Sequence, residues 1–113
     1  MEMFKEYIEE KFNNASVVYN ECGFIVYEMD DFGDNKMVFI NDIYVKPDHR
    51  HQGIASELAD EVCSIAKEYG CKYFTATVSP DAKTSNDTVK VLQAYGLTLW
   101  KSEPGLIWFY KEL

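Results

Sequence analysis

The sequence predicts a mixed α/β (α+β) fold, and three observations lead to that prediction. Segments with apolar residues at helical spacing alternate along the chain with short segments rich in Val, Ile, Phe and Tyr, which are typical of strands. Glycines and prolines stand at the borders between these segments. The 113 residues, of which 47% are hydrophobic and 15% aromatic, suffice for one core. We therefore expect a single domain over residues 1–113.

The first half of the chain predicts one helix and three strands. Phe4, Ile8 and Phe12 recur every four residues, as on one face of an amphipathic helix, and Asn13-Asn14 ends the pattern. Three segments rich in β-branched and aromatic residues follow: residues 16–20, 23–29 and 37–45. The polar cluster 30–35 predicts the turn before the third strand, which Pro47 stops.

The second half predicts two helices, a strand and a closing hairpin. One helical face carries five apolar residues: Ile54, Leu58, Val62, Ile65 and Ala66. Gly70 is placed to end this helix, and a strand is expected over residues 71–78. A further helix has Thr84, Ser85 or Asn86 as its cap. The hairpin strands are expected at 97–101 and 106–111, around a Ser-Glu-Pro-Gly turn.

The composition excludes some classes of partner. The formal net charge is −8, whereas nucleic-acid phosphates are met by clustered Lys and Arg, so we expect no nucleic-acid partner. The negative charge suits a cationic acceptor such as a polyamine, an amino sugar or a lysine side chain, and equally it suits simple solubility. No apolar run reaches the length of a membrane span, and the charged N-terminus lacks the apolar core of a signal peptide. We expect a cytoplasmic protein with no membrane partner.

The cysteines and histidines predict neither a disulfide framework nor a metal site. Cys22, Cys63 and Cys71 are odd in number and unevenly spaced, as in a reducing compartment. Cys63 lies within a helical pattern and Cys71 at a strand, where we interpret both as buried thiols. His49 and His51 form a lone pair, whereas a metal site takes three or four ligands. We therefore expect no metal.

The stretch Arg50-His51-Gln52-Gly53-Ile54-Ala55 is the most informative part of the chain, because it joins a predicted strand to a predicted helix. The first N–H groups of a helix have no partner within it, so a phosphate can accept from them at the positive end of the helix dipole. Gly53 and Ala55 keep side chains away from such a ligand, and Arg50 adds a permanent positive charge. The alternative is an ordinary strand-to-helix connection that contains a glycine.

The spacing Arg-x-x-Gly-x-Ala resembles the signature of the GNAT superfamily of acetyl-CoA-dependent N-acyltransferases, which cradles the pyrophosphate of acetyl-CoA. Residues 43–49 are similar to the apolar strand of that family, its Val, and its turn of Pro, acidic and aromatic residues. The resemblance is strongest over residues 39–69. It is looser at the C-terminal helix, where Ser85 and Thr88 stand at the family's Asn and Ala positions. It implies a GNAT-like mixed, mostly antiparallel central sheet with a splayed parallel strand pair, flanked by helices.

The front of the chain departs from the family, whose members begin with a strand and two helices that shape the acceptor site. Here only a short segment precedes the first predicted strand. We therefore expect the family's first strand and helical lid to be missing or reduced, and the acceptor side to be open or completed by a second subunit. The closing hairpin carries aromatic residues that are either core or a dimer interface, which leaves a homodimer open: Trp100, Trp108, Phe109 and Tyr110.

The resemblance also implies which residues hold acetyl-CoA. Residues 43–45 would pair with the pantetheine arm like an added strand, and the Val45 N–H would face the thioester oxygen. The amides of residues 52–56 would bind the pyrophosphate. The expected cofactor-binding residues are Ile43, Tyr44, Val45, Arg50, His51, Gln52, Gly53, Ile54, Ala55, Ser56, Ser85 and Asn86. For Ser85 and Asn86, plain N-capping of the helix is the alternative.

A proton-accepting Glu is implied on the strand before the motif, but Phe39 stands at that position. Asp42 is the nearest carboxylate of this strand. Strand alternation puts Asp42 and Tyr44 on one face, and Asn41 and Ile43 on the other. We take Asp42 as the candidate general base, acting directly or through water. A solvated carboxylate on the strand face is the alternative.

The candidate acid is Tyr95. The family's Tyr, which protonates the leaving thiolate, falls on Leu92 in this chain, and Tyr95 lies one helical turn further along. Since Tyr95 continues the apolar stripe of Val89 and Leu92, a core aromatic is the alternative. A coenzyme A thiolate leaves readily, so a missing acid would slow the reaction without preventing it.

The sequence thus predicts an N-acetyltransferase that transfers the acetyl group of acetyl-CoA to a primary amine of a small molecule or peptide by direct attack, without a metal. The alternative is a GNAT-like module that binds acyl-CoA or a protein partner without turnover. Phe39 at the base position and Leu92 at the acid position favour the alternative. Gly53 and Ala55 favour a retained cofactor site, because a chain without a ligand there has no need for small residues.

Overall fold

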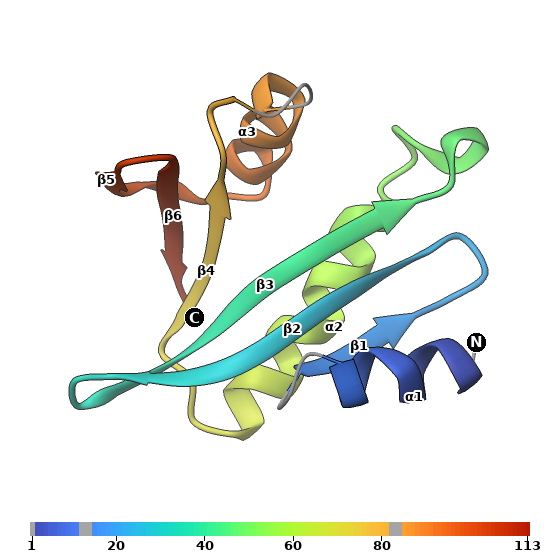
Figure 1. The fold of residues 1–113 in the computed structure, drawn as a ribbon, viewed down its shortest axis with the longest axis horizontal. Coiled ribbons are helices and arrows are strands. Elements are labelled where there is room, and N and C mark those ends of the chain that lie inside the picture. The colour runs from blue at the N-terminus through green and yellow to red at the C-terminus, as the bar shows by residue number, and fades with distance from the viewer. Residues whose placement is uncertain (1, 12–14, 82–84) are drawn as a thin grey trace.

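The structure of the protein is a computed structural model, and it describes residues 2–11, 15–81 and 85–113. The helices are α1 (Glu2–Lys11), α2 (Ile54–Glu68) and α3 (Ser85–Ala94), and a 3₁₀ turn, Pro47–His49, precedes α2. The strands are β1 (Ala15–Tyr19), β2 (Gly23–Phe32), β3 (Asn35–Val45), β4 (Tyr73–Val78), β5 (Thr98–Glu103) and β6 (Leu106–Glu112). Helices and strands follow one another in the predicted order (Figure 1).

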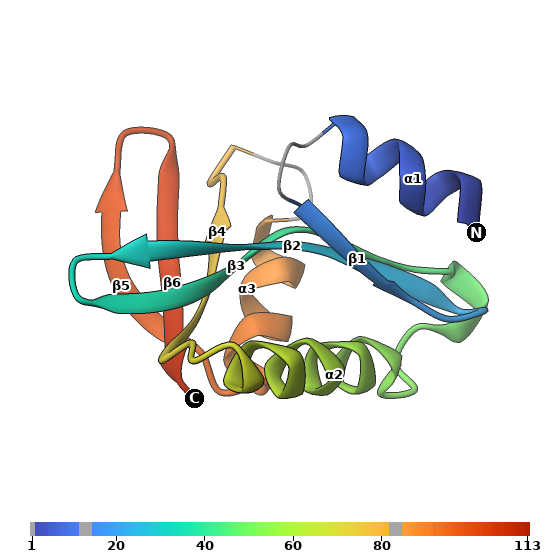
Figure 2. The ribbon, with the colours of Figure 1, turned by 90° about the horizontal axis from the view of Figure 1, so that it is seen from below.

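The strands form one sheet with the order β1-β2-β3-β4-β6-β5 (Figure 1). Neighbouring strands are antiparallel except β3 and β4, which run parallel. The predicted mixed, mostly antiparallel sheet is therefore confirmed. Figure 2 shows α1 on one face of the sheet and α2 on the other. We call these the α1 face and the α2 face; residues of α3 pack against the core on the α2 face.

β3 and β4 pair over only part of their length. Their ladder ends at Ile40 and Ala76, whereas β3 continues to Val45 and β4 to Val78. Beyond the ladder the two strands diverge widely, as Figure 1 shows. Strands that diverge leave backbone N–H and C=O groups without a ladder partner. The splayed parallel pair expected from the sequence is thus present, and it opens a gap at the C-terminal ends of both strands.

The main core lies between the sheet and α2. Val38 and Val62 are 0% exposed and Leu58 is 1% exposed, so the inner face of α2 packs directly on the central strands. A smaller apolar cluster lies beneath α1, where Phe4 packs against three buried residues of β1 and β2: Ala15, Val17 and Val26. Burial of such side chains stabilises the fold by about 1.5–3 kcal/mol for each large one. The two clusters fix the sheet between its helices.

β2 is longer than the sequence predicts. A turn is predicted over residues 30–35, but β2 ends only at Phe32, and Gly33-Asp34 alone form the turn. Asp31 lies opposite Lys36 in the ladder, and Gly33 adopts a φ of 61°, which suits a tight hairpin. Cross-strand pairing therefore outweighs the turn preference of the acidic residues.

A β-bulge interrupts β3 at Asn41. The residues on either side of it, Ile40 and Asp42, lie opposite successive residues of β2, so Asn41 is the extra residue. The predicted strict alternation does not hold across Asn41, because Ile40 and Ile43 both pack against the main core. Asp42 and Tyr44 share the α1 face as predicted, beside the cluster beneath α1.

The second helix ends as the sequence predicts. Gly70 has a φ of 85°, and its N–H donates to the Lys67 carbonyl oxygen at 3.0 Å. The next N–H, that of Cys71, donates to the Ala66 carbonyl oxygen at 2.9 Å. This pattern satisfies the last carbonyl groups of α2 and turns the chain towards β4.

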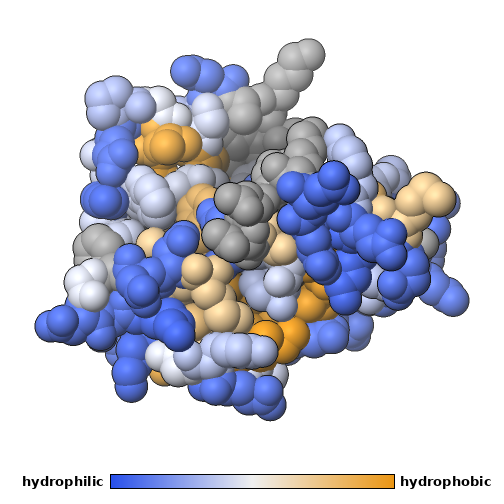
Figure 3. Space-filling view, turned by 60° about the horizontal axis from the view of Figure 1, so that its bottom comes forward, coloured by the Kyte–Doolittle hydropathy of each residue, from blue (hydrophilic) through white to orange (hydrophobic). Residues whose placement is uncertain are grey.

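The outer surface is largely polar in the view of Figure 3, where hydrophilic side chains surround small apolar patches. Among the described residues, no helix combines the length and the apolar character needed to cross a membrane.

Candidate functional site

The segment between β3 and α2 has the backbone geometry of an anion-binding loop. Gly53 is the N-cap of α2, and its carbonyl oxygen accepts the first helical hydrogen bond, from the Glu57 N–H at 3.0 Å. No side chain caps this end of α2. In the described part of the chain, the amides of Ile54, Ala55 and Ser56 therefore have no partner within the helix and are available to a ligand.

Two residues of this loop have a left-handed backbone, since φ is 63° at His51 and 81° at Gly53. A Cβ on Gly53 would meet no atom within 4 Å. Glycine is thus favoured here by the backbone angle, and not by crowding within the chain. The space into which a side chain at Gly53 would point is open.

Arg50 connects the loop to the end of β3. Its Nε donates a 2.9 Å hydrogen bond to the Val45 carbonyl oxygen, and its guanidinium carbon lies 5.8 Å from the centre of the Tyr44 ring. The side chain is exposed, so its charge lies at the rim of the loop. Gln52 stabilises the same loop, because its Nε2 donates to the Asp48 carbonyl oxygen at 3.3 Å.

The last residues of β3 present backbone groups to the gap between β3 and β4. The Lys46 N–H donates to the Cys22 carbonyl oxygen at 2.7 Å, which fixes the direction of the preceding groups. Backbone groups of successive residues in an antiparallel ladder point to opposite sides. Those of Tyr44 therefore point towards β2, and those of Ile43 and Val45 point away from it. In the described structure Asp42 Oδ1 accepts from the Ile43 N–H and Arg50 donates to the Val45 carbonyl oxygen, so the Ile43 carbonyl oxygen and the Val45 N–H are left for an extended ligand.

Gly23 allows β3 to lie close to β2 at this point. It is opposite Val45 in the ladder. A Cβ on Gly23 would lie 2.1 Å from the Tyr44 carbonyl oxygen and 2.9 Å from the Val45 Cα, closer than real atoms approach. Only glycine fits here without a shift of the end of β3. Gly23 therefore helps to place the backbone that faces the gap.

Asp42 lies beside the gap on the α1 face. It is exposed and stands opposite Val26. Its Oδ1 accepts a 2.8 Å hydrogen bond from the Ile43 N–H, so the carboxylate lies over the open edge of β3. The position suits a group that acts on a molecule in the gap, whereas the exposure suits a solvated carboxylate.

The structure separates Tyr95 from Asp42. Tyr95 lies on the α2 face, where its hydroxyl donates a 2.6 Å hydrogen bond to Asp60 Oδ1 and lies 3.5 Å from the Cys63 Sγ. Burial raises the pKa of Tyr95, and the hydrogen bonds to Asp60 and Cys63 raise it further. The ring also packs against the main core. These contacts favour the core aromatic over the proton donor.

Ser85 and Asn86 are the first two residues of α3. Their side chains, and Thr84 as a whole, lie outside the described part of the structure. Figure 1 shows α3 and the loop before α2 on opposite sides of the gap between β3 and β4. The backbone of α3 thus lies on the β4 side of the divergent strands, and the loop on the β3 side.

Glu28 is a half-buried carboxylate that sequence reasoning missed. It lies on β2 directly opposite Phe39, on the α1 face. Burial raises the pKa of Glu28, and the neighbouring charge of Asp30 raises it further. The signal in the sequence is a single acidic residue inside the apolar run of residues 23–29. The register between β2 and β3 was needed to place it opposite Phe39.

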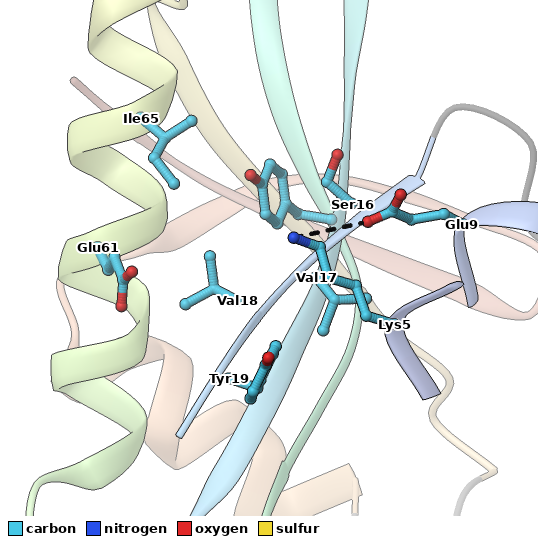
Figure 4. Close-up of a pocket in the computed structure, with 9 residues that line it drawn as sticks. Lys5, Glu9, Ser16, Val17, Val18, Tyr19, Glu61 and Ile65 are labelled. Atoms are coloured by element: carbon cyan, nitrogen blue, oxygen red, sulfur yellow. Dashed lines mark ion pairs between the residues drawn. The ribbon is translucent and has the colours of Figure 1, made fainter. Parts of the chain in front are cut away.

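A separate hollow lies at the free edge of β1 (Figure 4). Its walls come from α1 and α2, and its lining includes Lys5, Glu9, Tyr19, Glu61 and Ile65. None of the site residues predicted from the sequence lines it. Within the described residues, no three His, Cys, Asp or Glu side chains are grouped so that they could hold a metal ion.

Three features characterise the fold and its site: the splayed strand pair, the bulge in β3, and the helix start whose amides are free to bind a ligand. Residues 2–91 match the family model of the Acetyltransferase (GNAT) family. The chain is a member of this family, as the resemblance of its loop implied.

Curated relatives share part of the chain. Thialysine N-epsilon-acetyltransferase from Sus scrofa is 39% identical over 61 residues, which are 54% of this chain and 36% of that protein. Aminoglycoside N(6')-acetyltransferase type 1 from Acinetobacter genomosp. 13 is 38% identical over 50 residues, 44% of this chain and 34% of that protein. The match therefore spans about a third of the length of each of these relatives.

A solved structure matches almost the whole chain. The GNAT family acetyltransferase from Elizabethkingia anophelis, determined with acetyl-CoA bound, superposes with a TM-score of 0.72 at 22% sequence identity. The match covers 96% of this chain and 83% of that one. At this identity the likeness establishes the shared fold.

Proposed function

We propose that the protein is a single-domain N-acetyltransferase that transfers the acetyl group of acetyl-CoA to a primary amine by direct attack. The observation that carries this proposal is that the gap between β3 and β4 leads to the open amides at the start of α2. The gap offers backbone hydrogen bonds, and the helix start offers positive charge to an anion. Acetyl-CoA has the matching parts, since an arm with two amide groups joins its thioester to a pyrophosphate.

In this proposal the cofactor is held mainly by backbone. Ile43 and Val45 pair with the pantetheine arm, and the Val45 N–H faces the thioester oxygen. The amides of residues 52–56 bind the pyrophosphate, with Arg50 at the rim of the site. The start of α3 closes the other side of the gap. The open space at Gly53 and the hydrogen-bond direction of β3 support these assignments.

The reaction requires that the amine and the thioester are held together and that protons are transferred. The amine nitrogen attacks the thioester carbon, the C–S bond breaks, and the coenzyme A thiolate leaves. Holding amine and thioester together makes this step nearly unimolecular, and a backbone N–H stabilises the oxyanion. A carboxylate on the α1 face takes the proton of the ammonium, and Asp42 is the candidate base predicted from the sequence. Tyr95 has no part in the proposal, because its hydroxyl is bonded to Asp60.

The acceptor is a cationic primary amine. The curated relatives are named for thialysine and for aminoglycosides, both of which carry such groups. The net charge of −8 favours the approach of a cation. The free cysteines among the described residues suit the reducing cytosol, where we place the reaction.

The proposal is tested first by calorimetric titration of the protein with acetyl-CoA. We expect saturable binding with one site per chain. Thialysine, lysine and kanamycin are then offered as acceptors, with release of coenzyme A as the readout. Absence of binding at millimolar acetyl-CoA would overturn the proposal.

A binding module without turnover is the second candidate, and the engaged hydroxyl of Tyr95 and the exposure of Asp42 favour it. Both candidates predict acetyl-CoA binding, so only turnover separates them. Asp42→Asn is expected to lower the rate of coenzyme A release while leaving the affinity for acetyl-CoA unchanged. Binding without release of coenzyme A for any acceptor would favour the module.

A further inference from the structure

Glu28 occupies a place on the α1 face that the proposed reaction can use. It stands opposite Phe39, one residue before the point at which the ladder between β3 and β4 ends at Ile40. Side chains directly opposite in an antiparallel pair lie about 5 Å apart at Cβ. The Glu28 carboxylate is therefore beside the start of the gap, on the same face as Asp42.

The surroundings of Glu28 are apolar and acidic. Phe39, its cross-strand neighbour, contacts the Trp108 ring with centroids 5.6 Å apart. The indole Nε1 of Trp108 is buried and has no hydrogen-bond partner among the described atoms. β1 faces Glu28 through Ala15, and β4 presents Thr75 opposite Phe39. Aromatic faces next to a carboxylate form an environment that attracts a cation.

The carboxylates of Asp42 and Glu28 differ in their exposure and in their hydrogen bonds. Asp42 is exposed and already accepts the Ile43 N–H. Glu28 is half-buried, and no hydrogen bond or ion pair to its carboxylate is recorded within the described residues. The neighbouring charge that acts on Glu28 is that of Asp30 on β2, and Asp42 of β3 lies on the same face. Lys101 of β5 brings a positive charge to the Trp108 ring, with its Nζ 5.0 Å from the ring centre. Lys101 is already paired with Glu103, at 3.1 Å, and makes no ion pair with Glu28 in the described structure. The Glu28 carboxylate therefore has no positive partner there.

We propose that Glu28 binds the ammonium of the acceptor on the α1 face and takes its proton. The inference rests on the proposed function. In the step, one N–H bond of the ammonium breaks and the proton moves to a Glu28 oxygen. The freed lone pair forms the bond to the thioester carbon, the C–S bond breaks, and coenzyme A leaves as the thiolate. The nitrogen then loses a second proton, and both protons pass to water and to the thiolate.

The geometry also indicates the class of acceptor. Phe39 lies opposite the carboxylate and the Trp108 ring lies beyond Phe39, so the carbon chain that carries the ammonium has an apolar surface to contact. The acceptor is thus a primary alkylammonium with the amine at the end of an unbranched chain. Burial raises the pKa of Glu28, which brings it closer to that of a base suited to neutral pH.

The decisive variant is Glu28→Gln, compared with Glu68→Gln on the surface of α2. With the best acceptor from the screen, we expect Glu28→Gln to lower kcat/KM about 100-fold or more near neutral pH. The loss should shrink as the pH rises towards the amine pKa of about 10, because a growing fraction of the acceptor amine is then already deprotonated and needs no base. Glu68→Gln, at an exposed glutamate that ends α2 on the opposite side of the sheet, should keep the pH profile of the natural protein. A Glu28→Gln profile equal to that of the natural protein would overturn the inference.

The affinity for acetyl-CoA separates this role from a general loss of structure. Glu28→Gln should bind acetyl-CoA with unchanged affinity in calorimetry. It should also unfold at the same temperature as the natural protein or higher, because the charged form of Glu28 is the one that burial disfavours. Loss of cofactor affinity in this variant would assign Glu28 to the fold and not to the acceptor.

A measurement without turnover keeps the two proposals distinguishable. The Glu28 side-chain carboxyl carbon is followed by NMR in the presence of coenzyme A while n-butylamine, a minimal alkylammonium probe, is added at high concentration. We expect its resonance to shift, and those of exposed glutamates on α1 to stay in place. A Glu28 resonance that does not respond would overturn the inference even if acetyl transfer is found. A shift of the Glu28 resonance without any acetyl transfer would support the ammonium subsite and contradict the proposed reaction.

Discussion

The phenolic hydroxyl of Tyr95, just beyond α3, donates a 2.6 Å hydrogen bond to Asp60 Oδ1 in the middle of α2. The same side chain contacts Phe74 of β4, with ring centroids 5.7 Å apart. Lys111 Nζ lies 4.2 Å from the centre of the Tyr95 ring and donates to its carbonyl oxygen at 3.4 Å. Tyr95 therefore joins the end of α3 to a helix and two strands on the face opposite the proposed acceptor.

Tyr95→Phe should affect stability and leave catalysis unchanged. Loss of the hydroxyl removes the bond to Asp60, and we expect the free energy of unfolding to fall by about 1 kcal/mol. Urea unfolding measures this change, and kcat/KM should equal that of the natural protein. Tyr73→Phe is the control, since Tyr73 makes an edge contact with the Tyr110 ring and no recorded hydroxyl bond in the described structure. A large drop in kcat at full stability would restore Tyr95 as the acid.

Gly53→Glu and Gly105→Glu form a matched pair for the cofactor site. φ is 81° at Gly53 and 82° at Gly105, and a Cβ at either position would meet nothing within 4 Å. Both substitutions should therefore lower the free energy of unfolding by roughly 1–2 kcal/mol through the left-handed backbone. Only Gly53→Glu puts a carboxylate at the start of α2, so only this variant should lose acetyl-CoA binding in calorimetry. Equal affinities in the two variants would contradict the site.

Gly23→Ala should move the end of β3. The added Cβ overlaps the Tyr44 carbonyl oxygen, so we expect the free energy of unfolding to fall by about 1–3 kcal/mol. Because Val45 lies opposite Gly23, the affinity for acetyl-CoA should fall as well. Urea unfolding and calorimetry measure the two effects. Gly33→Ala, in an open turn with a φ of 61°, is the control and should leave the affinity unchanged.

The thiols should differ in reactivity. Cys71 is 5% exposed, and burial raises the pKa of its thiol, which lowers the fraction of reactive thiolate. Cys22 is partly exposed at the turn between β1 and β2. At mildly alkaline pH, iodoacetamide should label Cys22 in the native protein, and Cys71 only after urea is added. Mass spectrometry of tryptic peptides distinguishes the two, and early labelling of Cys71 would show that its strand opens readily.

Elements that depend on residues close together in the chain were predicted correctly from the sequence. The apolar spacing from Ile54 to Ala66 gave α2, and Gly70 gave its end. The loop before α2 was predicted as an open helix start because it depends on a single glycine and on the helix that follows. The extent of β2 was not predicted, since the pairing of Asp31 with Lys36 depends on the partner strand.

The candidate catalytic residues were harder to predict. Asp42 was chosen as the candidate base because it is near the motif in the chain. It shares a face with Tyr44 as expected, because alternation holds beyond the bulge. Tyr95 was chosen by helical spacing, which does not reveal that its hydroxyl is bonded across to α2. Glu28 was missed, because it is distant from the motif in the sequence and reaches Phe39 only through strand register.

The sequence by itself determined the order of helices and strands and the loop that can hold an anion, because these depend on contacts between residues near each other in the chain. The tertiary structure decided where β3 leaves β4, that Asn41 forms a bulge, and that Glu28 stands beside the resulting gap. These features depend on hydrogen bonds between separate strands. A shift of one residue in such a ladder turns every side chain to the opposite face, so local patterns do not specify them.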